Sequence, residues 1–341
     1  MSDCRRPKDG FGCEGEDVAR QEPSNHIDRV VTALAAGGAA RSPLVASWSR
    51  SARLHGLSPE IRSKPVRLTE TELHAARDRM EPMIRTAAPS LDRLFQAVGG
   101  VGCCVMLADS EGVPVERRGA IADDVTFEDW GLWTGTVWSE AQEGTNGIGT
   151  CLAEGRQVTI HRNQHFLARN TGLSCITAPI HDAEGRIAGA LDVSSARADL
   201  TEGFLGLIAL SVTDAARRIE ADLFRLAFPR ARLMMVPGQD RGNGALLAVD
   251  ADDLVIGATH AARQALGLAG DLAAQPRPVA DLLGQGADDG FEAAERAVVA
   301  RALARAGGNV SAAARALGIS RATLHRKLGP RAGLRPDPLD E

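Results

Sequence analysis

The sequence contains no tyrosine, and only three of its 39 Lys and Arg residues are lysines. It also lacks any apolar run of the roughly 18 residues that a transmembrane helix needs. Its first residues, MSDCRRPKDGFGCEGEDVAR, contain no apolar stretch of the kind that a secretory signal requires. We therefore expect a cytoplasmic protein with no membrane partner.

The six cysteines form no Cys-x-x-Cys pair and show no zinc-finger spacing, so the sequence predicts neither a disulfide framework nor a structural metal. His161 and His165 are four residues apart, a spacing that on a helix would place both rings on one face as metal ligands. The preceding residues 158–160 have the pattern of a strand, however, and no third ligand is nearby. We expect no metal and no cofactor.

Acidic residues are absent from one long stretch. From Arg296 to Arg335 the sequence has nine basic residues and no Asp or Glu, although the whole chain has a net charge of -5. The rest of the chain therefore carries -14, since -5 minus +9 is -14. A basic module attached to an acidic body is the charge distribution expected when one end of a protein contacts nucleic acid.

Two segments have the pattern of β-hairpins. CCVMLADSEGVPVERRG, residues 103–119, gives two strand-like runs around a turn at Asp109 to Gly112. ITAPIHDAEGRIAGALDVSS, residues 176–195, repeats this layout around Asp182 to Gly185. The sequence therefore predicts an antiparallel sheet.

Helical patterns precede and follow these hairpins. An amphipathic helix is predicted over residues 69–97, where Pro82 and Pro89 should kink or divide it. A second long helix is predicted from Leu200 to Leu226, from apolar residues at helical spacing. Helices that flank an antiparallel sheet define an α+β domain.

The C-terminal stretch FEAAERAVVARALARAGGNVSAAARALGISRATLHRKL divides into three predicted helices. Gly307 and Gly308 end the first helix, whose apolar stripe should include Ala294, Val298 and Leu303. Gly318 suits a tight turn, and Ser320 caps the third helix, with Leu324 and Leu328 buried. Two short helices joined by such a turn form a helix-turn-helix, whose second helix enters the major groove of DNA. The alternative is an alanine-rich helical hairpin with an arginine-covered solvent face.

This stretch resembles the Fis-type helix-turn-helix of bacterial regulators. The resemblance implies that the unit binds double-stranded DNA, with Ser320, Arg321 and Arg326 at bases and Asn309, Ser311, Thr323 and Lys327 at the backbone. His325 stands where that family often has Tyr or Arg. Because such readers commonly match two half-sites, we expect a homodimer, with the helix Leu200 to Leu226 as its contact.

Three further segments resemble regulators of the acetoin-operon type, which depend on sigma-54: SWSRSARLHGLSPE (47–60), WSEAQEGTNGIGTCLAEGRQVTIHRNQHF (138–166) and LSCITAPIHDAEGRIAGALDVSS (173–195). The resemblance implies a GAF sensor domain, and ALLAVDADDLVIGATHAARQALGL (245–268) resembles the start of a PAS-like segment. A Walker loop needs Gly-Lys-Ser or Gly-Lys-Thr, and no lysine here has that context. The central AAA+ ATPase domain of the family is therefore missing, and RNA polymerase or a full-length regulator are further candidate partners.

These patterns predict the following organisation. The expected parts are a disordered arm (1–26), an N-terminal helical segment (27–64), a GAF-like sensor domain (65–226), a PAS-like segment and linker (227–290), a Fis-type helix-turn-helix (291–330) and a tail (331–341).

A small-molecule effector is expected to bind in the GAF-like domain, because aromatic walls with a few polar groups suit a small organic ligand. The candidate pocket residues are Trp130, Trp133, Trp138, Glu143, Thr145, Asn146, Thr150 and Cys151. The alternative is that Trp138 and the glycines of 144–149 only shape a loop against the sheet.

Thiol chemistry is the competing hypothesis for this domain. Cys103, Cys104, Cys151 and Cys175 could come together in the sheet, as in free-standing GAF proteins that reduce methionine sulfoxide. A redox thiol must be accessible and prone to ionise. Buried cysteine that serves as a small apolar residue is the commoner case. We therefore expect a ligand-responsive transcription regulator rather than an enzyme.

Overall fold

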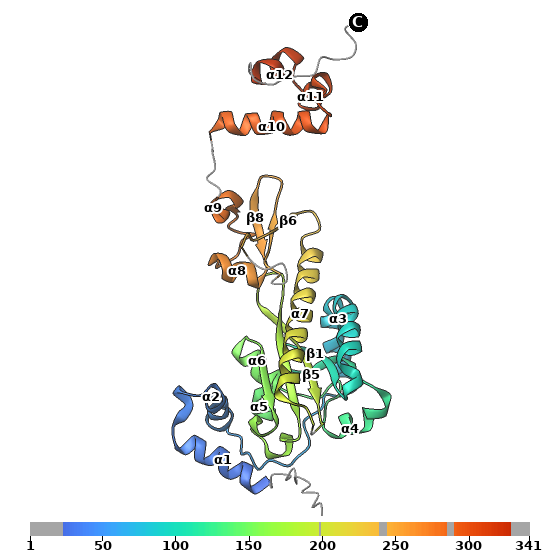
Figure 1. The fold of residues 1–341 in the computed structure, drawn as a ribbon, viewed down its shortest axis with the longest axis vertical. Helices are drawn as coiled ribbons and strands as arrows, with labels where there is room; N and C mark the ends of the chain where they lie inside the picture. Colours follow the sequence, from blue (N-terminus) through green and yellow to red (C-terminus); the bar gives the residue numbers. More distant parts are fainter. Residues whose placement is uncertain (1–22, 198, 239–243, 285–289, 329–341) are drawn as a thin grey trace, which may run out of the picture. The chain divides into compact units, whose positions relative to one another are not determined.

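The computed structural model describes residues 23–197, 199–238, 244–284 and 290–328. The chain divides into two compact units, residues 1–276 and 277–341, and each is described by itself (Figure 1). Most of the predicted disordered arm, and the tail from residue 331, lie outside the described residues. The last residues assigned to that arm, 23–26, begin helix α1 (Pro23–Ala35).

The first unit contains a five-stranded antiparallel sheet of order β2-β1-β5-β4-β3. Both predicted hairpins are confirmed, since β1 pairs with β2 and β4 pairs with β5. The two hairpins join where β1 and β5 pair, with Met106 opposite Asp192. The strands are β1 (Cys104–Asp109), β2 (Pro114–Arg118), β3 (Val158–His161), β4 (Ser174–His181) and β5 (Ile187–Ser195).

Helices cover both faces of this sheet. On one face α3 (Glu70–Val98) and α7 (Glu202–Ala227) pack on Val105 and Leu107 of β1. On the other face, Met106 packs with Phe127 and Trp138. That face carries α4 (Asp124–Asp129), α5 (Glu140–Glu143) and α6 (Gly147–Glu154), with the short turns η3 (Gly99–Val101), η4 (Ile121–Asp123), η5 (Arg162–Gln164) and η6 (Ala168–Asn170) in the connections. Alternate residues of β1 thus enter two cores.

Helix α3 runs continuously through both of its prolines, although the sequence predicts a kink or a division there. Pro82 and Pro89 are both exposed. The backbone carbonyls that lose their N–H partners therefore face water, which can satisfy them. The Thr69 cap at the start of the helix closes a capping box with Glu72, as its side chain accepts from the Glu72 backbone N–H.

The N-terminal helical segment packs beside the α4–α6 face. It consists of α1, η1 (Gly38–Ala40), α2 (Pro43–Ser49) and the π-helical turn η2 (Arg50–Leu54). Trp48 is buried with Phe166 and Leu167, and its indole Nε1 donates to the Gln164 carbonyl at 2.8 Å. One aromatic side chain therefore anchors α2 to the loop after β3.

A smaller antiparallel sheet follows α7 in the same unit. Its strands within this unit are β6 (Arg232–Met235), β7 (Leu246–Val249) and β8 (Leu254–Ala258), followed by α8 (His260–Leu266). The ring of His260 stacks on His181 of β4 with centroids 3.7 Å apart. Helices combined with antiparallel sheet confirm the predicted α+β class.

The second unit ends in three helices. After β9 (Arg277–Pro278) and α9 (Val279–Leu283) come α10 (Phe291–Arg305), α11 (Val310–Ala316) and α12 (Arg321–Leu328). Val299, Ala302 and Leu324 form its core with Val310, Ala313 and Ala314. The predicted stripe of α10 was wrong by one position: Val298 is 42% exposed, while Val299 is buried. Spacing alone leaves that choice open, because the two adjacent valines fit either helix face equally well.

Candidate functional site

Helices α11 and α12 form the predicted helix-turn-helix. The Asn309 side chain caps α11 by accepting from the Ala312 backbone N–H at 2.9 Å, and Ser320 caps α12 by accepting from Thr323 N–H at 3.1 Å. Gly318 between the helices has a φ of 66°, a conformation that favours glycine. Alanines at the crossing let the two helices pack closely on Leu324. The short capped helix is thus held rigidly on a small core.

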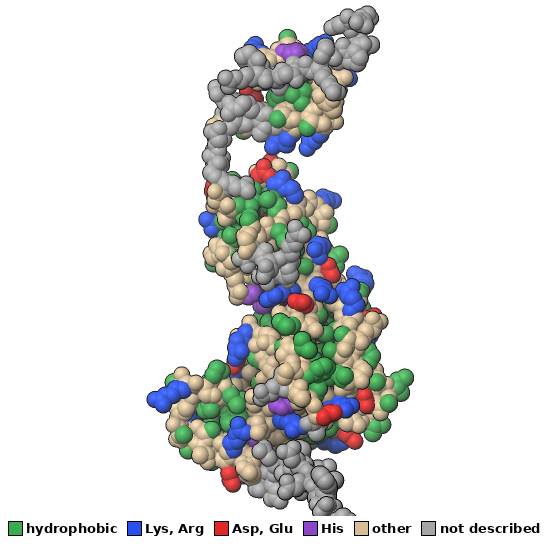
Figure 2. All heavy atoms as spheres, in the orientation of Figure 1, with side chains coloured by type: hydrophobic (Ala, Val, Ile, Leu, Met, Phe, Trp, Pro, Cys, Tyr) green, Lys and Arg blue, Asp and Glu red, His purple; other side chains and the backbone are tan. Residues whose placement is uncertain are grey.

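The polar residues of α12 lie on its outside. Arg321, His325 and Arg326 are exposed, and Thr323 is half-buried with its hydroxyl 2.8 Å from that of Ser320. On the face seen in Figure 2, Lys and Arg side chains surround the apolar centre of this unit. Asn309 and Ser320 are exposed at the helix starts, and Ser311 is half-buried. The arrangement offers cationic and hydroxyl groups to a large anionic partner.

Lys327 is already engaged within the unit. Its ammonium donates to the carboxylate of Glu295 on α10, and both side chains are partly exposed. Glu295 lies just before the acid-free stretch, so the sequence pattern did not include it. A DNA phosphate would have to compete with this carboxylate for Lys327.

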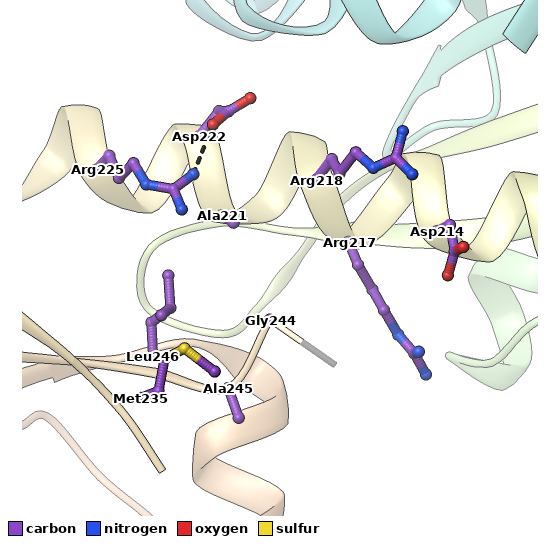
Figure 3. A pocket seen from close by; sticks show the side chains of 10 residues that line it. All are labelled: Asp214, Arg217, Arg218, Ala221, Asp222, Arg225, Met235, Gly244, Ala245 and Leu246. Carbon is purple, nitrogen blue, oxygen red and sulfur yellow. Dashed lines mark hydrogen bonds and ion pairs between the residues drawn. The ribbon is translucent and has the colours of Figure 1, made fainter. Parts of the chain in front are cut away.

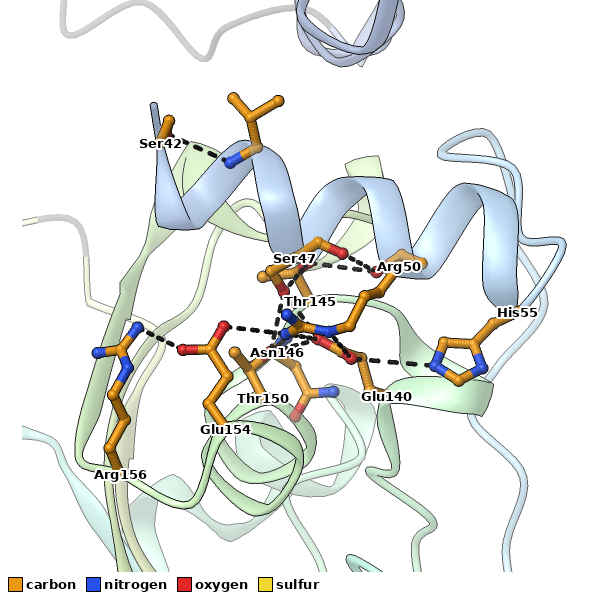
Figure 4. Close-up of polar contacts among 12 residues, drawn as sticks. Ser42, Ser47, Arg50, His55, Glu140, Thr145, Asn146, Thr150, Glu154 and Arg156 are labelled. Carbon is orange, nitrogen blue, oxygen red and sulfur yellow. Dashed lines mark hydrogen bonds and ion pairs between the residues drawn. The ribbon is translucent and has the colours of Figure 1, made fainter. Parts of the chain in front are cut away.

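The predicted sensor residues divide among three places. Thr145 and Thr150 are buried in a polar cluster with Glu140 that the N-terminal segment fills (Figure 4). Ser47 of α2 donates to Glu140 Oε1 at 2.7 Å and lies 2.7 Å from the Thr145 hydroxyl. Arg50 contacts both carboxylate oxygens of Glu140, at 2.8 and 3.0 Å, which raises the pKa of its guanidinium. These hydroxyls therefore bond to the protein's own N-terminal helix.

Glu143 and Asn146 bond to other residues. Arg169 donates to both oxygens of the buried Glu143 carboxylate, and Asn170 donates to one at 3.1 Å. Burial nevertheless raises the pKa of Glu143 above its ordinary value, because desolvation outweighs the attraction of Arg169. Asn146 is the N-cap of α6, accepting from Gly149 N–H at 2.9 Å.

The three tryptophans lie apart. Trp138 is buried in the core and donates to the Gly131 carbonyl at 2.9 Å, as the loop-shaping alternative expects. Trp133 lies under the Arg117 guanidinium, 4.3 Å from its ring centroid, and Trp130 lines an open hollow. Cys151 is buried against Val158 and Ile160. Within the described part of the chain, the eight predicted residues do not line one common cavity.

The thiol hypothesis finds no support in the geometry. Cys103, Cys104, Cys151 and Cys175 are all buried, and burial raises the pKa of each thiol, that of Cys103 to about 11. Such thiols are protonated at neutral pH and poorly nucleophilic. Cys4 and Cys13 lie outside the described residues.

The two histidines of the metal hypothesis do not share a helix. His161 ends β3, with Nδ1 2.8 Å from the Ser174 hydroxyl, and His165 follows the short turn η5. Burial lowers the pKa of His165 to about 4, and its Nδ1 donates to the Arg162 carbonyl. In the described ranges no group of three or more His, Cys, Asp or Glu side chains is arranged to hold a metal ion.

Sequence reasoning missed Ser47, Arg50 and Arg169 as partners of the predicted polar residues. Ser47 and Arg50 belong to the first segment that carried the family resemblance, which was the available signal. Arg169 had no motif around it. Only the fold brings these side chains to their partners: Arg50 is 90 positions from Glu140 in the sequence, and Arg169 is 26 positions from Glu143.

Another hollow lies along α7. It measures about 350 Å³ and is bounded by Arg217, Arg218 and Arg225 on the helix and by Met235 and Leu246 on the small sheet (Figure 3). Asp214 and Asp222 alternate with these arginines, and Asp222 accepts from Arg225 at 2.7 Å. The charges of the helix wall are thus interleaved rather than of one sign.

Comparison with known proteins identifies both ends of the chain. Residues 26–221 match the family model described as MimR, N-terminal domain, and residues 290–329 match that of bacterial regulatory proteins of the Fis family. The chain therefore belongs to the MimR N-terminal domain family and ends in a Fis-type helix-turn-helix. The resemblance to acetoin-type regulators is confirmed.

Three relatives are named as regulators. The acetoin catabolism regulatory protein of Cupriavidus necator is 33% identical over 72% of this chain and 37% of that protein. The acetoin dehydrogenase operon transcriptional activator AcoR of Bacillus subtilis is 30% identical over 52% and 29%, respectively. The propane 2-monooxygenase operon transcriptional activator MimR of Mycolicibacterium smegmatis is 31% identical over 46% and 26%. The chain thus spans about a third of the length of these relatives.

Among solved structures, the N-terminal part of DhaR in the E. coli DhaR(N)–DhaL complex is 18% identical over 70% of this chain and 81% of that chain, with a TM-score of 0.49. The three lysines of the sequence lie in no Gly-Lys-Ser or Gly-Lys-Thr, so the chain has no Walker loop. No helix in the described ranges is both long enough and apolar enough to cross a lipid bilayer.

Proposed function

We propose that this protein is a sequence-specific DNA-binding transcriptional regulator whose GAF-like domain senses a small molecule. It acts without driving sigma-54 polymerase by ATP hydrolysis, because the chain has no Walker loop. The observation that carries the proposal is α12, a capped helix that presents Arg321, His325 and Arg326 outward on a rigid core. We keep the predicted division into sensor (65–226), PAS-like segment (227–290) and DNA reader (291–330).

Base readout is assigned to Arg321 and Arg326. An arginine that pairs with O6 and N7 of guanine contributes roughly 1 to 3 kcal/mol of discrimination. Both side chains are exposed on α12, at and beyond its first turn. Ser320 at the helix start, with His325 on the same surface, completes this reading surface. Asn309, Ser311, Thr323 and Lys327 are assigned to the phosphate backbone, where contacts set the register of the helix.

A homodimer follows from the same proposal, since helix-turn-helix readers bind half-sites about 34 Å apart. Helix α7 offers the contact: Leu207 and Leu210 are 61% and 68% exposed. Gly203 and Gly206 beside them have open space where a Cβ would stand, so a second helix can approach closely. Apolar residues one turn apart on a helix pair well with the same residues of a parallel copy.

The proposal is tested by fluorescence anisotropy with genomic fragments that include the promoter regions near the gene. We expect nanomolar binding to a subset of fragments at low salt and a linear fall of log K with log salt. Arg321→Ala should reduce the ratio of specific to non-specific affinity by about 5- to 150-fold, the equivalent of 1 to 3 kcal/mol. Arg277→Ala, on the same unit but outside the three helices, is the control and should change neither affinity.

Three outcomes would contradict this assignment. Absence of any complex at low salt removes the DNA-binding function. Equal affinity for all fragments in the native protein favours an architectural DNA-binding protein instead. If Arg321→Ala retains full sequence preference, base readout by that residue is wrong.

A further inference from the structure

A hollow of about 280 Å³ opens beside Trp130 on the first unit. Three segments distant in sequence form it. They supply Arg62, Lys64 and Pro65 from the linker before α3, Asp129 and Trp130 from the end of α4, and Arg169 and Asn170 from η6. None of the residues that bond to Glu140 lines it, whereas Trp130 also packs against the core that contains Phe127 and Trp138. Convergence of three segments on one concave surface is typical of a ligand site.

The lining of the hollow is positively charged on balance, since it holds the basic residues Arg62, Lys64 and Arg169 and one carboxylate, Asp129. Arg62 is exposed, and no carboxylate among the described residues pairs with it. Lys64 Nζ lies 3.9 Å from Asp129 Oδ1, and both side chains are largely exposed, so this pair is loose. Arg169 is neutralised by Glu143 beneath it. An anionic group placed between Arg62 and Lys64 would therefore gain charge-assisted hydrogen bonds without displacing a buried partner.

The wall of the hollow is apolar and fixed in position. Trp130 is half-buried, and Pro65 also lines the hollow. Gly172 lies directly behind the ring, where an added Cβ would stand 2.7 Å from Trp130 Cη2. The indole therefore cannot retreat, and it offers a flat surface to a ligand with an apolar body.

We propose that this hollow binds a small organic carboxylate, whose apolar body lies against Trp130 and whose charge is held by Arg62 and Lys64. The inference rests on the sensor role proposed above and names the chemical class of the effector. It also replaces the eight-residue pocket expected from sequence, of which Trp130 lines the hollow and Glu143 lies beneath it.

The hollow is connected to the N-terminal segment by one short helix. Arg169 and Asn170 line the hollow and hold Glu143, the last residue of α5. Glu140, the first residue of α5, holds Ser47 and Arg50 (Figure 4). A carboxylate held by Arg62 and Lys64 lies beside Arg169 and Asn170, the two residues that bond to Glu143, so that α5 and the contacts of the N-terminal segment respond to occupancy.

The experiment is isothermal titration calorimetry of the full chain without DNA, at pH 7.5. The probes are benzoate and isobutyrate, their neutral amides benzamide and isobutyramide, and inorganic phosphate. We expect at least one carboxylate to bind about tenfold or more tightly than its amide, with phosphate failing to compete. Arg62→Ser should weaken carboxylate binding about tenfold, whereas Arg230→Ser, an exposed arginine elsewhere on the unit, should not. Both side chains are exposed, so neither change should disturb folding.

Other outcomes contradict the proposal. Binding of neither carboxylate removes the site, and amides that bind as tightly as acids refute the charge argument. Phosphate that competes equally refutes the role of Trp130. Carboxylate binding that survives Arg62→Ser unchanged places the ligand elsewhere. DNA binding is measured separately. A protein that binds carboxylate but no DNA would therefore support this site and refute only the proposed regulator function.

Discussion

Asp192 is a carboxyl group placed where its charge is costly. It lies fully buried in β5, on the face of the sheet that α6 covers. Burial raises the pKa of its carboxyl from 3.8 to about 6, although the hydroxyls of Ser194 and Thr177 donate to it. The native state thus holds the proton more tightly than the unfolded chain does. Ionisation therefore costs stability progressively as the pH rises from about 4 to above 6.

We expect Asp192→Asn to stabilise the protein at alkaline pH. The difference between 3.8 and about 6 corresponds to about 3 kcal/mol above pH 7, at 1.36 kcal/mol for each pH unit. Asn has nearly the same shape and carries no charge, so the variant should gain up to about 3 kcal/mol at pH 8. At pH 5, where the native carboxyl is largely protonated, the gain should fall to about half.

Urea unfolding followed by tryptophan fluorescence measures this gain. All four tryptophans lie in the first unit, so the signal excludes unfolding of the helix-turn-helix. Comparison of variant and parent at each pH cancels the titration of other groups, including His165. Its pKa is lowered to about 4, so it reduces stability as the pH falls below 6.5. A variant less stable than the parent at pH 8, or a gain equal at both pH values, would refute the reasoning.

Three further predictions concern single contacts. Glu295→Gln should release Lys327 and steepen the slope of log K for DNA binding against log salt concentration by up to about one unit. The control Asp281→Asn, with the same charge change, should alter this slope less. Equal slopes for the two variants would contradict the phosphate role of Lys327. Ser47→Ala should cost about 1 to 3 kcal/mol in urea unfolding because it leaves Glu140 and Thr145 short of a partner, with Ser49→Ala as a near-neutral control. Leu210→Glu should shift sedimentation toward monomer while Ile121→Glu, more exposed but off α7, should not; a dimer that survives moves the interface elsewhere.

The fold could be predicted where local patterns decide it. Turn residues at Asp109 to Gly112 and Asp182 to Gly185 fix the hairpins, and the Gly318 turn fixes the helix-turn-helix, because each signal acts within a few residues. The predicted division of α3 at Pro82 and Pro89 was wrong, because the solvent exposure of both prolines is a tertiary property. Sequence alone therefore predicts the features that a few neighbouring residues determine, and not those that depend on tertiary contacts.

The site was harder to predict because partners, not residue types, define it. Thr145, Thr150 and Glu143 were predicted to bind a ligand, but their partners in the structure are Ser47 and Arg169, distant in sequence. A polar residue in a Gly-rich loop looks the same whether it awaits a ligand or bonds to its own chain. Only burial separates the two cases, and burial depends on the whole fold.

The polar contact of the N-terminal segment has a consequence for regulation. An apolar interface of similar size would be insensitive to small shifts, whereas a buried carboxylate that loses one partner is destabilised strongly. Glu140 depends on Ser47 and Arg50 together, and it shares α5 with Glu143, whose partner Arg169 lines the hollow. A change at Arg169 therefore affects α2 through Glu143 and Glu140, two buried carboxylates on the single turn of α5. Hydrogen exchange should register this coupling, with residues 43–54 exchanging faster when a carboxylate binds and unchanged when an amide is added. Equal exchange rates with the carboxylate and with the amide would show that the hollow is not coupled to the N-terminal segment.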